Sequence, residues 1–256
     1  MTGIISGPGP TWRRWLPARR PGAPGRPRLF CFPPAGAGSA AFHAWTAALP
    51  ALDVCALEYP GRWTRLTEQP FTDVPLLVKT IADDINDLLQ GRYAFFGHSY
   101  GAVVAFELAR EVRRRGLAMT EHLFVGAARA PQLPPRPNPI RSLPDGQLIA
   151  ELGRRYGALP KMILDPEVLN MVVPIIRADI TAFETYTFRD EPPLPCPITA
   201  LCGRDDPAVD DRALDAWRHQ TAGRFCSHVL AGDHFFMNRS NAETFRIVRQ
   251  ELIPAS

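Results

Sequence analysis

The sequence has no apolar run near the roughly 20 residues that a helix needs to cross a bilayer. It also lacks the low hydrophobicity of a disordered chain, since 46% of its 256 residues are hydrophobic and 21% are charged. The formal net charge of +3 is too small and too scattered to indicate a nucleic-acid partner. We therefore expect a globular protein that neither spans a membrane nor binds nucleic acid.

Disulfide and metal-binding patterns are missing as well. The five cysteines cannot all pair, and no two of them have C-x-x-C spacing. Four of them lie in apolar, strand-like stretches, where a free thiol behaves as a small buried hydrophobe. The histidine, cysteine and carboxylate positions form no recognisable metal-ligand spacing. The expectation is a protein of a reducing compartment without a metal ion or another cofactor.

The first 27 residues are rich in proline, glycine and arginine. This composition predicts a loose leader over residues 1–27, followed by a folded domain over 28–256. The pair Arg13-Arg14 is similar to the start of a twin-arginine export signal, but no apolar stretch follows it. The predicted location is therefore the cytoplasm.

Short apolar runs rich in β-forming residues alternate with helical patterns along the folded domain. The runs cover 29–32, 54–59, 93–96, 122–126, 198–202 and 227–230. Such alternation predicts an α/β fold with a mainly parallel central sheet flanked by helices. Residues 131–197 break the pattern, because a proline-rich stretch is followed by two helical patterns with no strand between them. We interpret 131–197 as a helical lid inserted over the carboxyl edge of the sheet.

The sharpest motif is G-H-S-Y-G at 97–101, a G-x-S-x-G pentapeptide. Chance alone would place this pattern in roughly one chain in ten of this length. Its position is informative, because a predicted strand precedes it and a predicted helix follows it. In the α/β-hydrolase fold this arrangement exposes a nucleophilic serine on a strained strand-to-helix turn. The motif therefore predicts Ser99 as a nucleophile.

A serine nucleophile needs a base, and in this fold an acid and then a histidine follow it along the chain. His234 lies on a predicted loop between a strand and a helix, whereas His219 and His228 fall within regular elements. The acid follows the strand 198–202, where Asp205 and Asp206 are neighbours. Only one of these two can hold the imidazole, because adjacent side chains on extended backbone point to opposite sides.

Two backbone N–H groups are needed to stabilise the oxyanion formed during acyl transfer. One belongs to the residue after the nucleophile, Tyr100, and the other comes from the loop after the first strand. That loop covers 33–39 and makes Ala35 the candidate. Its glycines are faintly similar to a phosphate-binding loop, but no lysine follows them, so nucleotide binding is not expected.

Six segments together resemble the type II thioesterases, the stand-alone editing enzymes of polyketide and nonribosomal peptide synthases. They are F-P-P-A-G at 32–36, E-Y-P-G-R at 58–62, F-G-H-S-Y-G at 96–101, R-A-P at 129–131, G-x-x-D at 203–206 and G-x-H-F-F at 232–236. The similarity runs from about Trp12 to the C-terminus. The chain departs from the family at two positions, where Pro34 replaces a frequent histidine and Tyr100 a frequent methionine.

The resemblance implies a serine thioesterase with nucleophile Ser99, acid Asp206, base His234 and oxyanion amides from Ala35 and Tyr100. It also implies hydrolysis of acyl groups from the phosphopantetheine thiol of acyl or peptidyl carrier proteins, which would remove stalled or aberrant intermediates. The partners would be carrier domains of a synthase, and the basic leader is a candidate for docking them. The candidate lining of the acyl chamber comes from the lid, namely Met171, Ile175, Phe183 and Tyr186.

Three other functions are compatible with parts of the pattern. A carboxylesterase or lipase would use the same serine on free small esters. An acyltransferase or cyclising thioesterase would yield amides, esters or lactones instead of free acids. A non-catalytic binding module could have the same fold, but the intact order of serine, acid and histidine argues against it.

Overall fold

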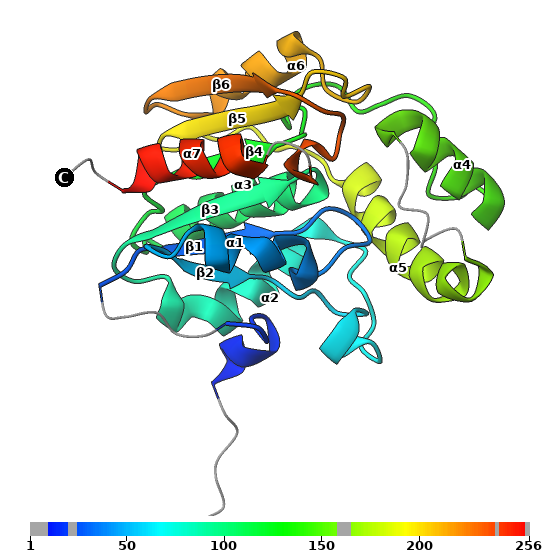
Figure 1. Ribbon diagram of the computed structural model, residues 1–256, viewed down its shortest axis with the longest axis horizontal. Helices are drawn as coiled ribbons and strands as arrows, with labels where there is room; N and C mark the ends of the chain where they lie inside the picture. Colours follow the sequence, from blue (N-terminus) through cyan, green and yellow to red (C-terminus); the bar gives the residue numbers. More distant parts are fainter. Residues whose placement is uncertain (1–9, 20–24, 158–164, 239–240, 254–256) are drawn as a thin grey trace, which may run out of the picture.

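The computed structural model describes residues 10–19, 25–157, 165–238 and 241–253. Six strands form one parallel sheet in the order β2-β1-β3-β4-β5-β6 (Figure 1). The strands are β1 (Arg28–Phe32), β2 (Asp53–Ala56), β3 (Tyr93–His98), β4 (Leu123–Gly126), β5 (Ile198–Gly203) and β6 (Phe225–Leu230). The predicted α/β fold with a parallel sheet flanked by helices is confirmed.

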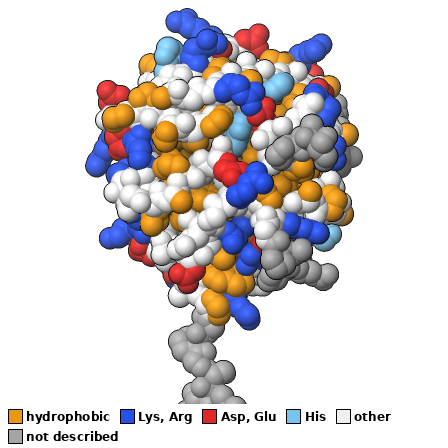
Figure 2. Space-filling view, turned by 90° about the vertical axis from the view of Figure 1, so that its left-hand side faces the viewer, with side chains coloured by type: hydrophobic (Ala, Val, Ile, Leu, Met, Phe, Trp, Pro, Cys, Tyr) orange, Lys and Arg blue, Asp and Glu red, His pale blue; other side chains and the backbone are white. Residues whose placement is uncertain are grey.

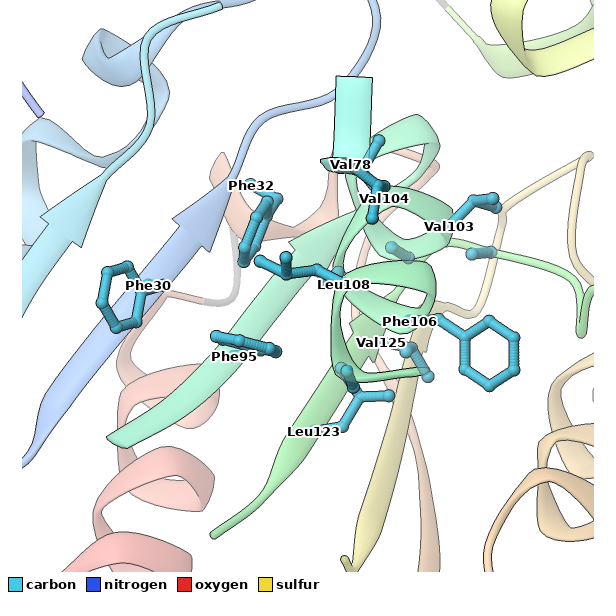
Figure 3. Packing of buried hydrophobic residues seen from close by; sticks show 14 of the residues in the cluster. Phe30, Phe32, Val78, Phe95, Val103, Val104, Phe106, Leu108, Leu123 and Val125 are labelled. Carbon is cyan, nitrogen blue, oxygen red and sulfur yellow. The ribbon is translucent and has the colours of Figure 1, made fainter. Parts of the chain in front are cut away.

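Strands β1, β3, β4 and β5 are buried along nearly their whole length on both faces of the sheet, which explains why they are apolar at consecutive positions. Because side chains alternate along a strand, Phe30 and Phe32 join one core, while Leu29 and Cys31 join a second core on the opposite face. Figure 3 shows Phe30 and Phe32 on the side of Phe95 and of the helix that follows Ser99. The sheet is thus the middle layer of three.

Helices cover each face of the sheet (Figure 1). Residues of α2 (Val74–Ile85) and α3 (Tyr100–Arg114) belong to the first core, and residues of α1 (His43–Ala48) and α7 (Asn241–Leu252) belong to the second. Helix α2 begins where the carboxylate of Asp73 accepts a hydrogen bond of 2.7 Å from the N–H of Leu76. The shorter helical segments are η1 (Thr11–Arg14), η2 (Ser39–Phe42), η3 (Trp63–Arg65), η4 (Asn86–Leu88), α6 (Asp211–Asp215), η6 (Ala216–Gln220) and η7 (Phe236–Asn238).

The connection between β4 and β5 contains α4 (Asp145–Tyr156) and α5 (Pro166–Thr185). Both helices lie beyond the carboxyl ends of the strands (Figure 1). They share a small apolar core of their own, formed by Ile140, Leu148, Leu152, Val173, Ile176 and Ile180. Helices α4 and α5 therefore lie at the edge of the sheet at which catalytic loops of an α/β protein gather, and the described residues of 131–197 are here called the lid.

The prediction of a loose leader over 1–27 is wrong for residues 10–19. Trp15 and Leu16 are 0% and 1% exposed and belong to the first core. The indole N–H of Trp15 donates to Asp84 at 2.6 Å, and Arg19 forms an ion pair with Asp53 at 2.6 Å. Composition does not reveal that this segment is anchored to the core, because two buried side chains are enough to hold a segment that is otherwise polar. Leader positions 1–9 and 20–24 lie outside the described residues.

The face turned away from the lid carries interspersed acidic and basic side chains (Figure 2). This distribution matches the small net charge of +3. Among the described residues, no helix has both the length and the apolar composition that crossing a bilayer requires.

Candidate active site

Ser99 lies on a sharp turn between β3 and α3, with a backbone φ of 54° and ψ of −118°. This is a strained conformation for a residue with a side chain. The flanking glycines permit it: a Cβ on Gly97 would lie 2.2 Å from the carbonyl oxygen of Gly101, and a Cβ on Gly101 would lie 2.1 Å from that of Phe32. The turn therefore requires glycine at both positions and directs the Ser99 hydroxyl away from the sheet.

The three predicted side chains converge although they are far apart in the chain. Nε2 of His234 lies 2.9 Å from Oγ of Ser99, and Nδ1 lies 2.9 Å and 3.1 Å from the two carboxylate oxygens of Asp206. The side chains of His234 and Asp206 are 3% and 0% exposed. With Nδ1 protonated and donating to Asp206, Nε2 is free to accept the Ser99 proton.

The choice between Asp205 and Asp206 is decided by the loop after β5. The N–H of Asp205 donates to the carbonyl of Gly232 at 2.9 Å, and the Asp205 side chain is exposed. Asp206 turns inward, where its Oδ1 also accepts a hydrogen bond of 2.7 Å from the N–H of Ala208. A Cβ on Gly203 would lie 2.1 Å from the carbonyl oxygen of Asp233, so this glycine lets the acid loop and the histidine loop touch.

The other histidines do not form part of this arrangement. His122 is buried directly before β4 and shares a hydrogen bond of 2.8 Å with Thr199, and His219 lies exposed in η6. His98 is next to the nucleophile, but burial and the nearby His234 lower its pKa to about 3. A histidine with that pKa stays neutral at physiological pH, so His98 places no positive charge next to His234.

Residues 34–37 of the loop after β1 line the smaller of two cavities beside Ser99, and one of their N–H groups has no hydrogen-bond acceptor among the described residues. Pro33 and Pro34 have no N–H, the N–H of Gly36 donates to Asp179 at 2.7 Å, and that of Ala37 donates to the Pro34 carbonyl at 3.1 Å. Among the described residues, this leaves the N–H of Ala35 without a backbone acceptor. We call residues 33–39 the oxyanion loop.

Tyr100 supplies the second candidate amide. It is the first residue of α3, where an N–H has no intrahelical acceptor and the helix dipole favours negative charge. Ala35 and Tyr100 line the same cavity as Ser99 and His234. The side chain of Tyr100, at a position where the family often has methionine, packs edge-on against Tyr59 and Phe183 at ring-centroid distances of 6.1 and 6.3 Å.

Two cavities meet at Ser99. The larger, of about 610 Å³, and the smaller, of about 280 Å³, share Ser99, Tyr156, Phe183 and His234 as lining. The wall of the larger cavity includes four arginines, Arg129, Arg136, Arg141 and Arg155. The smaller one is lined mainly by apolar groups, among them Leu152, Ile176, Ile180 and Met237. A bound substrate can therefore extend in two directions from the reacting carbonyl, one basic and one apolar.

The structure divides the four predicted lid residues into two pairs. Phe183 lines both cavities and Tyr186 lines the larger one. Met171 is 58% exposed and Ile175 is buried, and neither lines these cavities, so both predictions are wrong. The helical period explains the difference, because 176, 180 and 183 share one face of α5, whereas 171 and 175 are rotated away from it.

Sequence reasoning missed Tyr156, Arg62 and Asp179. The ring of Tyr156 lies 4.8 Å from that of His234 between centroids and lines both cavities. Arg62 and Asp179 form a buried ion pair beneath the oxyanion loop. The Y-P-G-R segment was a signal for Arg62, but nothing local marks its partner on α5.

Comparisons with known proteins agree with this geometry. The family model described as "Thioesterase domain" matches residues 27–252. Gramicidin S biosynthesis protein GrsT of Aneurinibacillus migulanus is 38% identical over 88% of this chain and 88% of its own length. Thioesterase PikA5 of Streptomyces venezuelae is 36% identical over 88% of this chain and 80% of its own length.

A solved structure gives the same result in three dimensions. The type II thioesterase BorB from the borrelidin biosynthetic cluster superposes with a TM-score of 0.81 and 36% identity, over 91% of this chain and 94% of that one. With a matching family model, similar full-length relatives and a serine site of the expected geometry, the chain belongs to the thioesterase family and is a thioester hydrolase with the α/β-hydrolase fold.

Proposed function

We propose that this thioesterase hydrolyses acyl groups from the phosphopantetheine thiol of acyl or peptidyl carrier proteins. In that role it would remove stalled or aberrant intermediates during polyketide or nonribosomal peptide biosynthesis, in the cytoplasm. The relatives support the setting, since GrsT is named for gramicidin S biosynthesis and BorB for the borrelidin cluster. The structural observation that carries the proposal is the pair of cavities that meet at Ser99.

Each cavity suits one half of such a substrate. The apolar cavity accepts an acyl chain, because burying its methylenes is favourable. The basic cavity accepts the phosphopantetheine arm, whose phosphodiester is anionic. Arg141 and Arg155 in its wall are neutralised by Glu184 and Glu151, at 3.4 and 2.7 Å.

Arg129 and Arg136 are the cations of this wall that suit the phosphodiester. Among the described residues they donate only to backbone carbonyls, those of Pro134 and Ala208. Burial and the neighbouring Arg136 lower the pKa of Arg129, a sign that the two positive charges repel each other. A phosphodiester bound between them would relieve that repulsion, since arginine matches phosphate geometry well.

The chemistry follows from the side chains already placed. Oγ of Ser99 attacks the thioester carbonyl carbon while its proton moves to Nε2 of His234. The resulting oxyanion accepts hydrogen bonds from the N–H groups of Ala35 and Tyr100. The carbon–sulfur bond then breaks, and the imidazolium returns the proton to the leaving thiolate.

Deacylation repeats these steps with water. His234 removes a proton from a water molecule that attacks the acyl-serine, and the bond to Oγ of Ser99 breaks as the serine regains its proton. The products are a free acid and a carrier protein with a free thiol. The proposed mechanism uses only side chains and amides of this chain and requires no cofactor.

Mass spectrometry of a panel of acylated carrier proteins tests the proposal. We expect the wild type to release free acids and holo carrier protein, and Ser99→Ala to lose on the order of 10⁶ in turnover. Matched oxygen esters of the same acyl chains serve as controls. Faster turnover of the free oxygen esters would instead identify a carboxylesterase, and lactone, amide or ester products would identify an acyl-transferring enzyme.

A further inference from the structure

The oxyanion loop is held from the lid by a buried carboxylate. Oδ2 of Asp179, on helix α5, accepts the N–H of Gly36 at 2.7 Å, directly after Ala35. The same oxygen accepts the Arg62 guanidinium in an ion pair whose two side chains are each 3% exposed. Asp179 thus connects the lid, the Y-P-G-R segment and the oxyanion loop at a single atom.

Arg62 holds the other side of the same turn. Its Nε donates to the carbonyl of Ala37 at 2.8 Å, and its Nη1 donates to that of Pro60 at 2.7 Å. Two peptide groups of the oxyanion loop are therefore fixed, the one between residues 35 and 36 through the Gly36 N–H and the one between residues 37 and 38 through the Ala37 carbonyl. Gly36 has a φ of 75°, and a Cβ there would lie 2.5 Å from Cγ1 of Ile176, so the loop also lies directly against α5.

Electrostatics make the two side chains dependent on each other. Burial raises the pKa of Asp179, whereas Arg62 and the Gly36 N–H lower it. A lone buried carboxylate here would oppose the negative charge that forms on the substrate oxygen, and a lone buried guanidinium would be left unpaired. Removing one partner of a buried pair is far more costly than replacing both by apolar groups.

We propose that Arg62 and Asp179 are positioning residues that place the Ala35 N–H for oxyanion stabilisation when α5 is seated on the loop. The seating of the lid and the assembly of the oxyanion site are then one event. This inference rests on the proposed role of Ala35 as an oxyanion donor. It assigns a catalytic consequence to a contact between two segments that are 117 residues apart.

The first test removes both charges at once, in the variant Arg62→Met with Asp179→Leu. Turnover of an acyl-N-acetylcysteamine thioester and binding of an alkylboronic acid are measured, because the tetrahedral boronate adduct of Ser99 uses the oxyanion donors. We expect kcat to fall about 10- to 100-fold, KM to change less than about threefold and boronate affinity to fall in parallel with kcat. A folded double variant with wild-type kcat and wild-type boronate affinity would overturn the proposal.

Arg177→Met is the matched control on the same helix. Arg177 pairs with Asp145 at 2.6 Å and donates to the carbonyl of Arg141, so its polar contacts among the described residues lie within the lid. We expect its kcat to stay within twofold of the wild type. An equal loss of kcat in this control would show that any damage to the lid lowers activity, which would also overturn the specific role of Arg62 and Asp179.

A second pair of variants keeps the test decisive if the double variant does not fold. Asp179→Asn and Asp179→Ala both remove the charge, but only asparagine keeps an acceptor for the Gly36 N–H. We expect kcat of Asp179→Asn to exceed that of Asp179→Ala about tenfold when both are assayed below their unfolding temperatures. Equal kcat values would refute the positioning role. If the wild type hydrolyses the small thioester but not acyl carrier proteins, that result would contradict the proposed function and leave the positioning role of Arg62 and Asp179 intact.

Discussion

Asp206→Asn is the most direct test of the proposed catalytic geometry, because it replaces a carboxylate by a neutral amide of almost the same volume. The Asp206 side chain is 0% exposed, and one oxygen already accepts the Ala208 N–H at 2.7 Å. In the variant the amide oxygen keeps that bond, so the amide NH₂ faces Nδ1 of His234. Nδ1 must then accept a hydrogen bond, and the ring proton moves to Nε2, which can no longer take the proton of Ser99.

The expected loss is about 10⁴ in kcat, or about 5 kcal/mol of transition-state stabilisation. It has two sources. The ring adopts the wrong tautomer, and the imidazolium that forms during attack loses its buried carboxylate partner. KM should change little, because Asp206 does not line either cavity that meets at Ser99.

The assay is thiol release from an acyl-N-acetylcysteamine thioester, followed with a chromogenic disulfide and supplemented by urea unfolding to establish that the variant is folded. Asp205→Asn is the matched control, since Asp205 is exposed and differs by one position. We expect this control to retain at least half of the wild-type kcat. A kcat of Asp206→Asn within tenfold of the wild type, or an equal loss in Asp205→Asn, would refute the assignment.

Three further predictions concern substrate binding, folding and pH. Arg136→Ala should raise KM for acyl carrier protein at least about tenfold, because it removes a cation that would bind the phosphodiester. KM for the N-acetylcysteamine thioester, which lacks the phosphodiester, should stay within about twofold of the wild type. Equal effects on both KM values would exclude a phosphate contact. Trp15→Ala should lower the free energy of unfolding by about 3–5 kcal/mol in urea titrations, because the indole is fully buried. Trp63→Ala is the control: its side chain is 73% exposed, so the free energy of unfolding should change by less than about 0.5 kcal/mol. Burial lowers the pKa of His98 to about 3 and of His122 to about 4, from 6.5. Between those values and 6.5 the unfolded state binds more protons, so the free energy of unfolding should fall as the pH falls from 7 to 4.5, by about 2–3 kcal/mol per histidine. His122→Gln should remove its own share of this loss, and an unchanged pH dependence would contradict the assignment.

The anchored segment 10–19 changes how the basic N-terminus is interpreted. Arg14 and Arg19 pair with Asp84 and Asp53, so these two charges are already neutralised within the fold. A truncation before residue 26 would remove Trp15 and Leu16 from the core, together with any docking contact. Loss of carrier-protein affinity after such a truncation would therefore reflect unfolding, and single substitutions in the larger cavity are the cleaner probe of the partner.

Local chemistry allowed the sequence alone to predict the sheet and to select Ser99 and His234 as the candidate nucleophile and base. Strands buried on both faces need continuous apolar runs, and a strained turn without room for a Cβ needs Gly97 and Gly101 around Ser99. His234 was identifiable because it lies on a loop between a strand and a helix. Each of these requirements acts over a few residues, so it leaves a pattern that can be read along the chain.

Only the tertiary structure decided how distant segments meet. It placed Asp206 against His234, turned Ile176 and Ile180 toward the smaller cavity in place of Met171 and Ile175, and buried Trp15 in the core. These outcomes depend on which face of an element meets a neighbour far away in sequence. The pair formed by Arg62 and Asp179 is the clearest case, because a buried ion pair is defined by its partner and its burial, and neither leaves a local signal in the chain.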